Sequence, residues 1–271
     1  MSRTVLVTGA GSGIGLATSV WIARRGYRVV GTVRAHDAAR AVAAAAAEAR
    51  THIDTVQLDV TDAGRCAEVV EALAPDALVN GAGFPVPGAI EDVDDATARL
   101  AFETMVIAPM RLARLALPHM RARGEGRIIN VSSVLGLIRV PLGGWYQAAK
   151  HALEAVTDAL RIEVASSGIQ VVLIEPGAVI TNMWHSFETR IEALRRTSVH
   201  DAGYQRMLDV PRVELLMLDA GQVAAEIGRA LTAVVPGARY RVGWDAHLFP
   251  LAQQLTPTAI TDRLLRLVFN L

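Results

Sequence analysis

The chain has 271 residues, with 27 basic and 27 acidic side chains and no net charge at neutral pH. Its arginines are scattered, so it lacks the basic patch that nucleic-acid binding requires. A single cysteine, Cys66, excludes an internal disulfide and a cysteine metal cluster, which fits a reducing compartment. We find neither an uncharged apolar stretch of about twenty residues nor a secretory segment before the first apolar run. We therefore expect a soluble, cytoplasmic protein without a membrane span.

Short β-branched runs alternate with longer helical stretches along the chain. The runs lie at residues 5–7, 28–33, 55–58, 77–79, 127–131, 170–174 and 239–242. This alternation is typical of βαβ units around a parallel sheet. The chain has no repeat and no linker rich in Pro, Gly or Ser. We predict an α/β fold in one domain, residues 1–271: a single doubly wound, Rossmann-type parallel sheet with helices on both faces.

A glycine-rich turn follows the first predicted strand, in the segment Thr8-Gly9-Ala10-Gly11-Ser12-Gly13-Ile14-Gly15. A helix-forming stretch begins directly after it. Glycines between a strand and a helix let the backbone approach a pyrophosphate, and the helix N-terminus supplies amide donors and partial positive charge. An ordinary turn is the alternative. We predict nucleotide contacts at Gly9, Ser12, Gly13, Ile14 and Gly15.

The chain's one lysine, Lys150, lies four residues after Tyr146. At this spacing the two side chains share one face of a helix. A compact ammonium there favours the phenolate form of tyrosine, so that Tyr146 can donate and accept a proton near neutral pH. A guanidinium is bulkier and always charged, and does not substitute for it. The alternative is a surface lysine beside a packing aromatic side chain.

Two segments interrupt the alternation of strands and helices. From residue 177 to about 219 the chain is irregular and rich in aromatic residues and methionine, which is typical of a lid or substrate loop. His185 is the histidine there that we expect to contact substrate. The segment from about 245 to 271 has the pattern of an amphipathic helix that covers the protein's own core; a partner or membrane surface is the alternative. The seven histidines have no metal-ligand spacing, so we predict no metal site.

Five motifs, in order from Thr4 to about Thr181, resemble those of the short-chain dehydrogenase/reductase family. They are similar to its cofactor turn, adenine-contacting pair, Asn-Asn-Ala-Gly stretch, catalytic serine and nicotinamide turn. Here they are Thr8 to Gly15, Asp59-Val60, Asn80-Gly81-Ala82-Gly83, Ser133 and Pro176-Gly177 with Val179 and Thr181.

The resemblance implies roles for these residues. Tyr146 exchanges a proton with the substrate oxygen, Ser133 hydrogen-bonds that oxygen, and Lys150 lowers the tyrosine pKa and binds the nicotinamide ribose. Ser133, Tyr146 and Lys150 are therefore the expected catalytic residues. The expected substrate contacts are Ser133, Tyr146 and His185. Beyond the glycine turn, the expected cofactor contacts are Asp59, Val60, Asn80, Gly81, Tyr146, Lys150, Pro176, Val179 and Thr181.

Two positions depart from the family pattern. Gly81 replaces an asparagine, and Met105 stands where the fourth catalytic residue, an asparagine that holds a water between the lysine and solvent, is expected. A thioether is only a weak acceptor, so the proton relay is in question. One interpretation is that Met105 packs helix against helix and water reaches Lys150 by another route. The other is a non-redox or NADP-sensing protein.

The end of the second predicted strand bears on the choice of cofactor. Val33 occupies the position where an acidic residue would bind the ribose of NAD, and Arg34, which could bind a 2′-phosphate, follows it. We predict NADP(H), with NAD as the less favoured alternative. Phe84 to Pro87 and the methionine-rich loop indicate an apolar pocket. We expect an oxidoreductase that interconverts a ketone and a secondary alcohol on a bulky steroid-, retinoid- or polyketide-like substrate. The resemblance further implies a homodimer or homotetramer.

Overall fold

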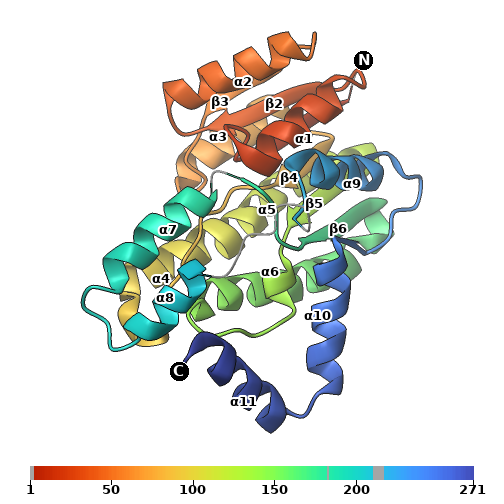
Figure 1. The fold of residues 1–271 in the computed structure, drawn as a ribbon. Coiled ribbons are helices and arrows are strands. Elements are labelled where there is room, and N and C mark those ends of the chain that lie inside the picture. The colour runs from red at the N-terminus through yellow and green to blue at the C-terminus, as the bar shows by residue number, and fades with distance from the viewer. Residues whose placement is uncertain (1–2, 182, 210–216) are drawn as a thin grey trace.

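Each predicted β-branched run forms a strand of one sheet in the computed structural model, which describes residues 3–181, 183–209 and 217–271. Neighbouring strands are all parallel, in the order β3-β2-β1-β4-β5-β6-β7 (Figure 1). The strands are β1 (Thr4–Thr8), β2 (Arg28–Val33), β3 (Asp54–Gln57), β4 (Ala77–Asn80), β5 (Gly126–Val131), β6 (Ile169–Pro176) and β7 (Arg239–Val242). The order reverses between β1 and β4, the place where this architecture binds nucleotides.

The crossover helices between strands are α1 (Gly13–Ala23), α2 (His36–Glu48), α3 (Ala63–Leu73), α4 (Asp95–Phe102), α5 (Ala108–Arg123), α6 (Gly144–Glu163) and α9 (Ala220–Thr232). Between α4 and α5 the chain forms one π-helical stretch, η2 (Glu103–Ile107). Short 3₁₀ turns are η1 (Ile90–Asp92), η3 (Val134–Gly136) and η4 (Ala165–Ser167). The remaining helices are α7 (Met183–Leu194), α8 (Asp201–Asp209), α10 (Trp244–Leu255) and α11 (Thr258–Phe269).

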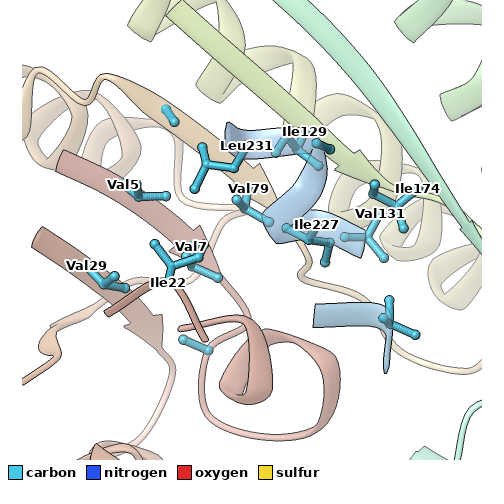
Figure 2. Close-up of a cluster of buried hydrophobic side chains, with 14 of the residues drawn as sticks. Val5, Val7, Ile22, Val29, Val79, Ile129, Val131, Ile174, Ile227 and Leu231 are labelled. Atoms are coloured by element: carbon cyan, nitrogen blue, oxygen red, sulfur yellow. The ribbon is translucent and has the colours of Figure 1, made fainter. Parts of the chain in front are cut away.

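Alternate residues of the central strands enter two separate cores, because successive strand side chains point to opposite faces. On one face Val5 and Val7 pack with Ile22 of α1 and Ile227 of α9 (Figure 2). On the other face Leu6 packs with buried residues of α3 and α5. This arrangement confirms the predicted doubly wound parallel sheet with helices on both faces.

The segment from residue 177 to 219 differs from the irregular loop that we expected. It contains the two helices α7 and α8, while residues 182 and 210–216 lie outside the described residues. Its ends are held together, because Ile180 N donates to Leu218 O at 2.8 Å and Leu218 N to Ala178 O at 2.9 Å. The buried Tyr204 anchors α8: its hydroxyl donates to Asp92 Oδ2 at 2.6 Å and accepts from Ala89 N at 2.7 Å.

The C-terminal segment also differs from expectation. It forms two helices, and α10 extends away from the sheet before α11 turns back toward α8 (Figure 1). Most of its apolar side chains remain exposed and do not enter the protein's own core. These exposed side chains are Trp244, Leu248, Phe249, Leu251, Leu255, Ile260, Leu264, Leu267, Val268 and Leu271. Within the described part of the chain, no helix combines the length and the hydropathy needed to cross a membrane.

Candidate active site

The glycine turn between β1 and α1 is packed too closely for larger residues. A Cβ on Gly15 would lie 2.2 Å from the carbonyl oxygen of Gly9, and Gly9 itself has a φ of +72°. The Thr8 hydroxyl holds the neighbouring turn after β4, since it accepts from Gly81 N at 3.0 Å and Ala82 N at 3.2 Å. The turns after β1 and β4 are thereby fixed side by side at the carboxyl edge of the sheet.

The turn after β6 reaches the same place from a distant part of the sequence. Thr181 lies against the glycine turn, where a Cβ on Gly13 would be 3.3 Å from its methyl carbon. Pro176 ends β6, and the next turn is tethered by the buried Asp245, whose Oδ2 accepts from Ala178 N at 2.7 Å. Sequence reasoning did not find Asp245, because its partner lies far away along the chain. Val179 is buried beside this turn.

Arg34 and Asp59 lie close together at the ends of β2 and β3. Both are exposed. Asp59 Oδ1 accepts from the backbone and hydroxyl of Thr61, and these bonds, with the charge of Arg34, hold the pKa of the carboxyl below its usual range. Val60 is buried, and its carbonyl accepts from Arg111 at 2.9 Å.

These residues fit the dinucleotide that the fold implies. The backbone cradle at Gly11 is one that a side chain would fill, since a Cβ there would lie 2.8 Å from that of Ala38. Ser12 is exposed at the start of α1, and its side chain makes no capping bond among the described residues. Gly13, Ile14 and Gly15 form the first turn of the helix, whose N-terminal amides suit a phosphate. The exposed Arg34 guanidinium suits a second one.

The side chain of Asn80 is hydrogen-bonded within the protein. Its side chain is buried and donates to Asn130 Oδ1 at 2.8 Å, and Asn130 donates to the Thr157 hydroxyl at 2.9 Å. The amide therefore joins β4, β5 and α6 within the protein. At Asn80 and Gly81 the backbone, not the amide, lies at the edge where a cofactor would bind.

Ser133, Tyr146 and Lys150 come together beyond the end of β5. Ser133 caps η3, where its hydroxyl accepts from Leu135 N at 3.1 Å. Tyr146 and Lys150 lie one turn apart on α6, and Lys150 Nζ is 5.8 Å from the centre of the tyrosine ring. The buried ammonium donates to Val131 O, the last residue of β5, at 2.8 Å.

Burial dominates the protonation of this pair. It raises the pKa of Tyr146 to about 12, against the opposing effect of a hydrogen bond with Ser133. The pKa of Tyr146 is therefore raised, whereas a neighbouring ammonium alone was expected to lower it. Burial also lowers the pKa of Lys150 to about 8, against the charge of Glu154. At neutral pH the phenol and the ammonium both carry their protons, as proton donation to a substrate requires.

Met105 lies in the π-helical stretch η2, a type of irregularity that is frequent at functional sites. It is 1% exposed and belongs to an apolar cluster with Val86 and Ala149, against which Tyr146 packs. A Cβ on Gly83 would be 3.5 Å from its sulfur. The thioether therefore fills the space between η2, α6 and the turn after β4.

His185 is exposed in the first turn of α7, where its carbonyl accepts from the Thr189 hydroxyl. The adjacent Trp184 donates from Nε1 to Val179 O at 2.8 Å, which holds this turn next to the end of β6. In the part of the chain that the structure describes, no three His, Cys, Asp or Glu side chains gather as metal ligands would.

Comparison with known proteins places the chain in a family. Residues 3–192 match the family model for short chain dehydrogenase. The chain is 34% identical to the uncharacterized oxidoreductase YusZ of Bacillus subtilis, over 97% of each protein. It is 33% identical to human retinol dehydrogenase 8, over 88% of this chain and 79% of that protein.

Among solved structures, a variant of actinorhodin polyketide ketoreductase with NADPH superimposes with a TM-score of 0.79 at 29% identity, covering 91% of this chain and 98% of that one. The family model matches well over half of the chain, and the YusZ similarity extends over nearly all of it. The chain therefore belongs to the short-chain dehydrogenase/reductase family and is an NAD(P)-dependent oxidoreductase.

Proposed function

We propose that the protein is an NADP(H)-dependent enzyme that interconverts a ketone and a secondary alcohol on a bulky apolar substrate. The observation that carries the proposal is the convergence of Ser133, Tyr146 and Lys150 at the carboxyl edge of the sheet, with Lys150 held by Val131 O. The glycine turn lies at the same edge, so the proton donor and the cofactor cradle are both at the carboxyl ends of the strands.

The nicotinamide, when bound, supplies or accepts the hydride. During reduction the protonated Tyr146 hydroxyl gives its proton to the substrate oxygen, while Ser133 donates a hydrogen bond to the same oxygen. The Lys150 ammonium stabilises the phenolate that remains. A single donor aimed at a developing oxyanion contributes about 3 kcal/mol to such a step. During oxidation the same groups work in the opposite sense.

Arg34 supports the preference for NADP(H). Its guanidinium is exposed directly after β2, whereas Val33 is buried and offers no carboxylate to a ribose. Asp37, the nearby acidic residue, forms an ion pair with Arg40. The polyketide ketoreductase to which the chain is similar was solved with NADPH.

The apolar surroundings of the site support a lipophilic substrate. Phe84 and Val86 belong to the cluster beside Tyr146. Ile180, between β6 and α7, and Met183, the first residue of α7, are exposed apolar residues. Two of the similar proteins are named for retinol and for a polyketide, which are bulky and largely apolar compounds. We propose His185 as a further contact to substrate.

Self-association and a cytoplasmic location stay predictions. The helices expected to pair, within 95–121 and 145–166, expose Leu100, Ile107 and Ile162. Sedimentation velocity would measure the oligomeric state.

The test is NADPH oxidation, followed by absorbance, with a panel of small and bulky ketones. Tyr146→Phe keeps the ring but removes the proton donor, so we expect a loss of at least about 100-fold in kcat with little change in NADPH affinity. Met105→Asn is run beside it and should keep or raise the wild-type rate. Wild-type turnover that survives in Tyr146→Phe would contradict the assigned proton donor.

Met105 in place of the expected asparagine favours one second candidate, a non-redox or NADP-sensing protein. In that case the wild type would bind NADPH but reduce none of the ketones, and turnover would appear only in Met105→Asn. That outcome would replace the reductase proposal.

A further inference from the structure

Two carboxylates continue the line of catalytic side chains along α6. Glu154 follows Lys150 by four residues, and Asp158 follows Glu154 by four more, so Tyr146, Lys150, Glu154 and Asp158 share one face of the helix. Glu154 is 7% exposed. A carboxylate is rarely buried to this degree unless it is paired.

Glu154 belongs to a partly buried network of charges that reaches from α6 to the edge of the sheet. Arg239 of β7 pairs with Glu154 at 3.3 Å, with Asp158 at 2.6 Å and with the fully buried Glu175 of β6 at 2.9 Å. Arg241 pairs with the other oxygen of Glu175 at 3.0 Å. The longest of these contacts is the one to Glu154, so Arg239 binds this carboxylate less closely than the other two.

One oxygen of Glu154 is buried without a hydrogen bond to the described residues. Glu154 Oε1 and the Ser132 hydroxyl are both buried, and neither has a hydrogen bond of standard geometry to the described residues. Ser132, Glu154 and Lys150 all lie against Gly136, where a Cβ would be 2.9 Å from Ser132 Oγ, 3.3 Å from Glu154 Cγ and 3.3 Å from the backbone of Lys150. A side chain at Gly136 would fill this space.

The charge of Glu154 affects the protonation of Lys150. Burial lowers the pKa of Lys150, and Glu154 is the charged group that raises it. Burial raises the pKa of Glu154, and Glu175 raises it further, while the Ser132 hydroxyl and Arg239 lower it. A buried ammonium without a counter-charge would lose its proton. Met105, at the other catalytic position, supplies only a thioether.

We propose that Glu154 is a positioning residue: it keeps Lys150 in the ammonium form at neutral pH and connects the Tyr146–Lys150 pair to the Glu175–Arg239 network. Its effect on turnover rests on the proposed function, but its effect on Lys150 does not. A purely structural role, in which Glu154 only joins α6 to β7, would leave the titration of Lys150 unchanged.

Because the chain has one lysine, protein grown on lysine labelled with ¹³C at the ε-carbon gives one NMR signal from a side chain, that of Lys150. Its pH titration reports the pKa of Lys150 without any turnover. In Glu154→Gln we expect this pKa to fall by about one pH unit, since an opposite charge one helical turn away is lost. Glu154→Asp keeps the charge and should stay close to the wild type.

Asp158→Asn is the matched control. It also removes a carboxylate from α6 that Arg239 binds, but one turn farther from Lys150. We expect the Lys150 titration to stay near that of the wild type in this variant. Turnover measured across pH should follow the same order. As the pH is raised, the rate of reduction should begin to fall at a lower pH in Glu154→Gln than in wild type or Asp158→Asn.

An unchanged Lys150 pKa in Glu154→Gln would overturn the inference, as would an equal fall in Glu154→Asp. A shifted pKa in a protein that reduces no ketone would support the inference and contradict the proposed function instead. If Glu154→Gln does not fold, the wild-type titration decides. Ionisation of Glu154 beside the ammonium should give the ε-carbon curve a second, smaller inflection, and a single-step curve would contradict the coupling.

Discussion

Replacing Gly15 with alanine should damage the nucleotide site through one added methyl group. Its Cβ would meet the Gly9 carbonyl oxygen at 2.2 Å, whereas ordinary contacts begin at 3.4 Å. The atom it meets is backbone, so no side chain can rotate away. The glycine turn and the start of α1 must separate by about 1 Å, and close-packed interiors resist such a shift.

Overpacking of this kind costs about 1–3 kcal/mol of stability. The displaced backbone is the one expected to bind the pyrophosphate, so NADPH affinity should fall at least about tenfold, the equivalent of about 1.4 kcal/mol. Fluorescence titration with NADPH measures the affinity, and urea unfolding measures the stability.

Gly64→Ala makes the same chemical change at an exposed site near the start of α3, where the nearest atom to an added Cβ is Asp62 Oδ1 at 3.5 Å. We expect this control to gain about 0.5–1 kcal/mol, because alanine favours the helix, and to bind NADPH normally. A Gly15→Ala protein with wild-type affinity and stability would refute the steric reasoning.

Four further results are expected. Arg34→Ala should weaken NADPH binding by about tenfold or more and leave NADH nearly unchanged; equal losses in the two titrations would contradict the assigned 2′-phosphate contact. Asp245→Ala leaves Ala178 N without its acceptor, so the free energy of unfolding should fall by about 1–3 kcal/mol and the KM for cofactor should rise. Ile227→Ala leaves a cavity at a fully buried position and should lower the free energy of unfolding in urea by about 2–5 kcal/mol; an unchanged urea midpoint would contradict this. The rate of ketone reduction should fall as pH rises through about 8, because Lys150 loses its proton there; a rate that is flat to pH 10 would contradict the role of the ammonium.

The features that sequence predicted best are those encoded by neighbouring residues. Most strands are short runs rich in apolar and β-branched residues, and each was found within a few residues of its observed bounds. Tyr146 and Lys150 were placed together because helical spacing alone brings them to one face. The glycine turn was recognised from its position between a strand and a helix, and the close contact of Gly15 with Gly9 explains its composition.

Helices α7 and α8 were missed because we interpreted their aromatic and methionine residues as a loop over a pocket, although these residues recur at helical spacing. Phe187 and Ile191 of α7 pack with Tyr204 of α8 in one cluster. The C-terminal helices gave a different difficulty. Their apolar residues predicted a buried face, but the chain turns at Pro257 and many of these side chains stay exposed.

Asp245 and Glu154 could not be identified as buried residues from sequence. An acidic residue in a helix normally indicates a solvated face. Their burial depends on partners 67 residues away, at Ala178, and 85 residues away, at Arg239. Only the crossover connections that bring β6, β7 and α6 together reveal these contacts.

The parallel register of the sheet has a consequence for how the chain folds. Val5 pairs with Val29 on one side and with Ala77 on the other, so the second edge of β1 stays open until β4 has been synthesised. Such non-local pairings fold slowly and expose unpaired edges on the way. We expect β1, β2 and β3 to associate first, in an intermediate whose open β1 edge makes it prone to aggregate until β4 closes it.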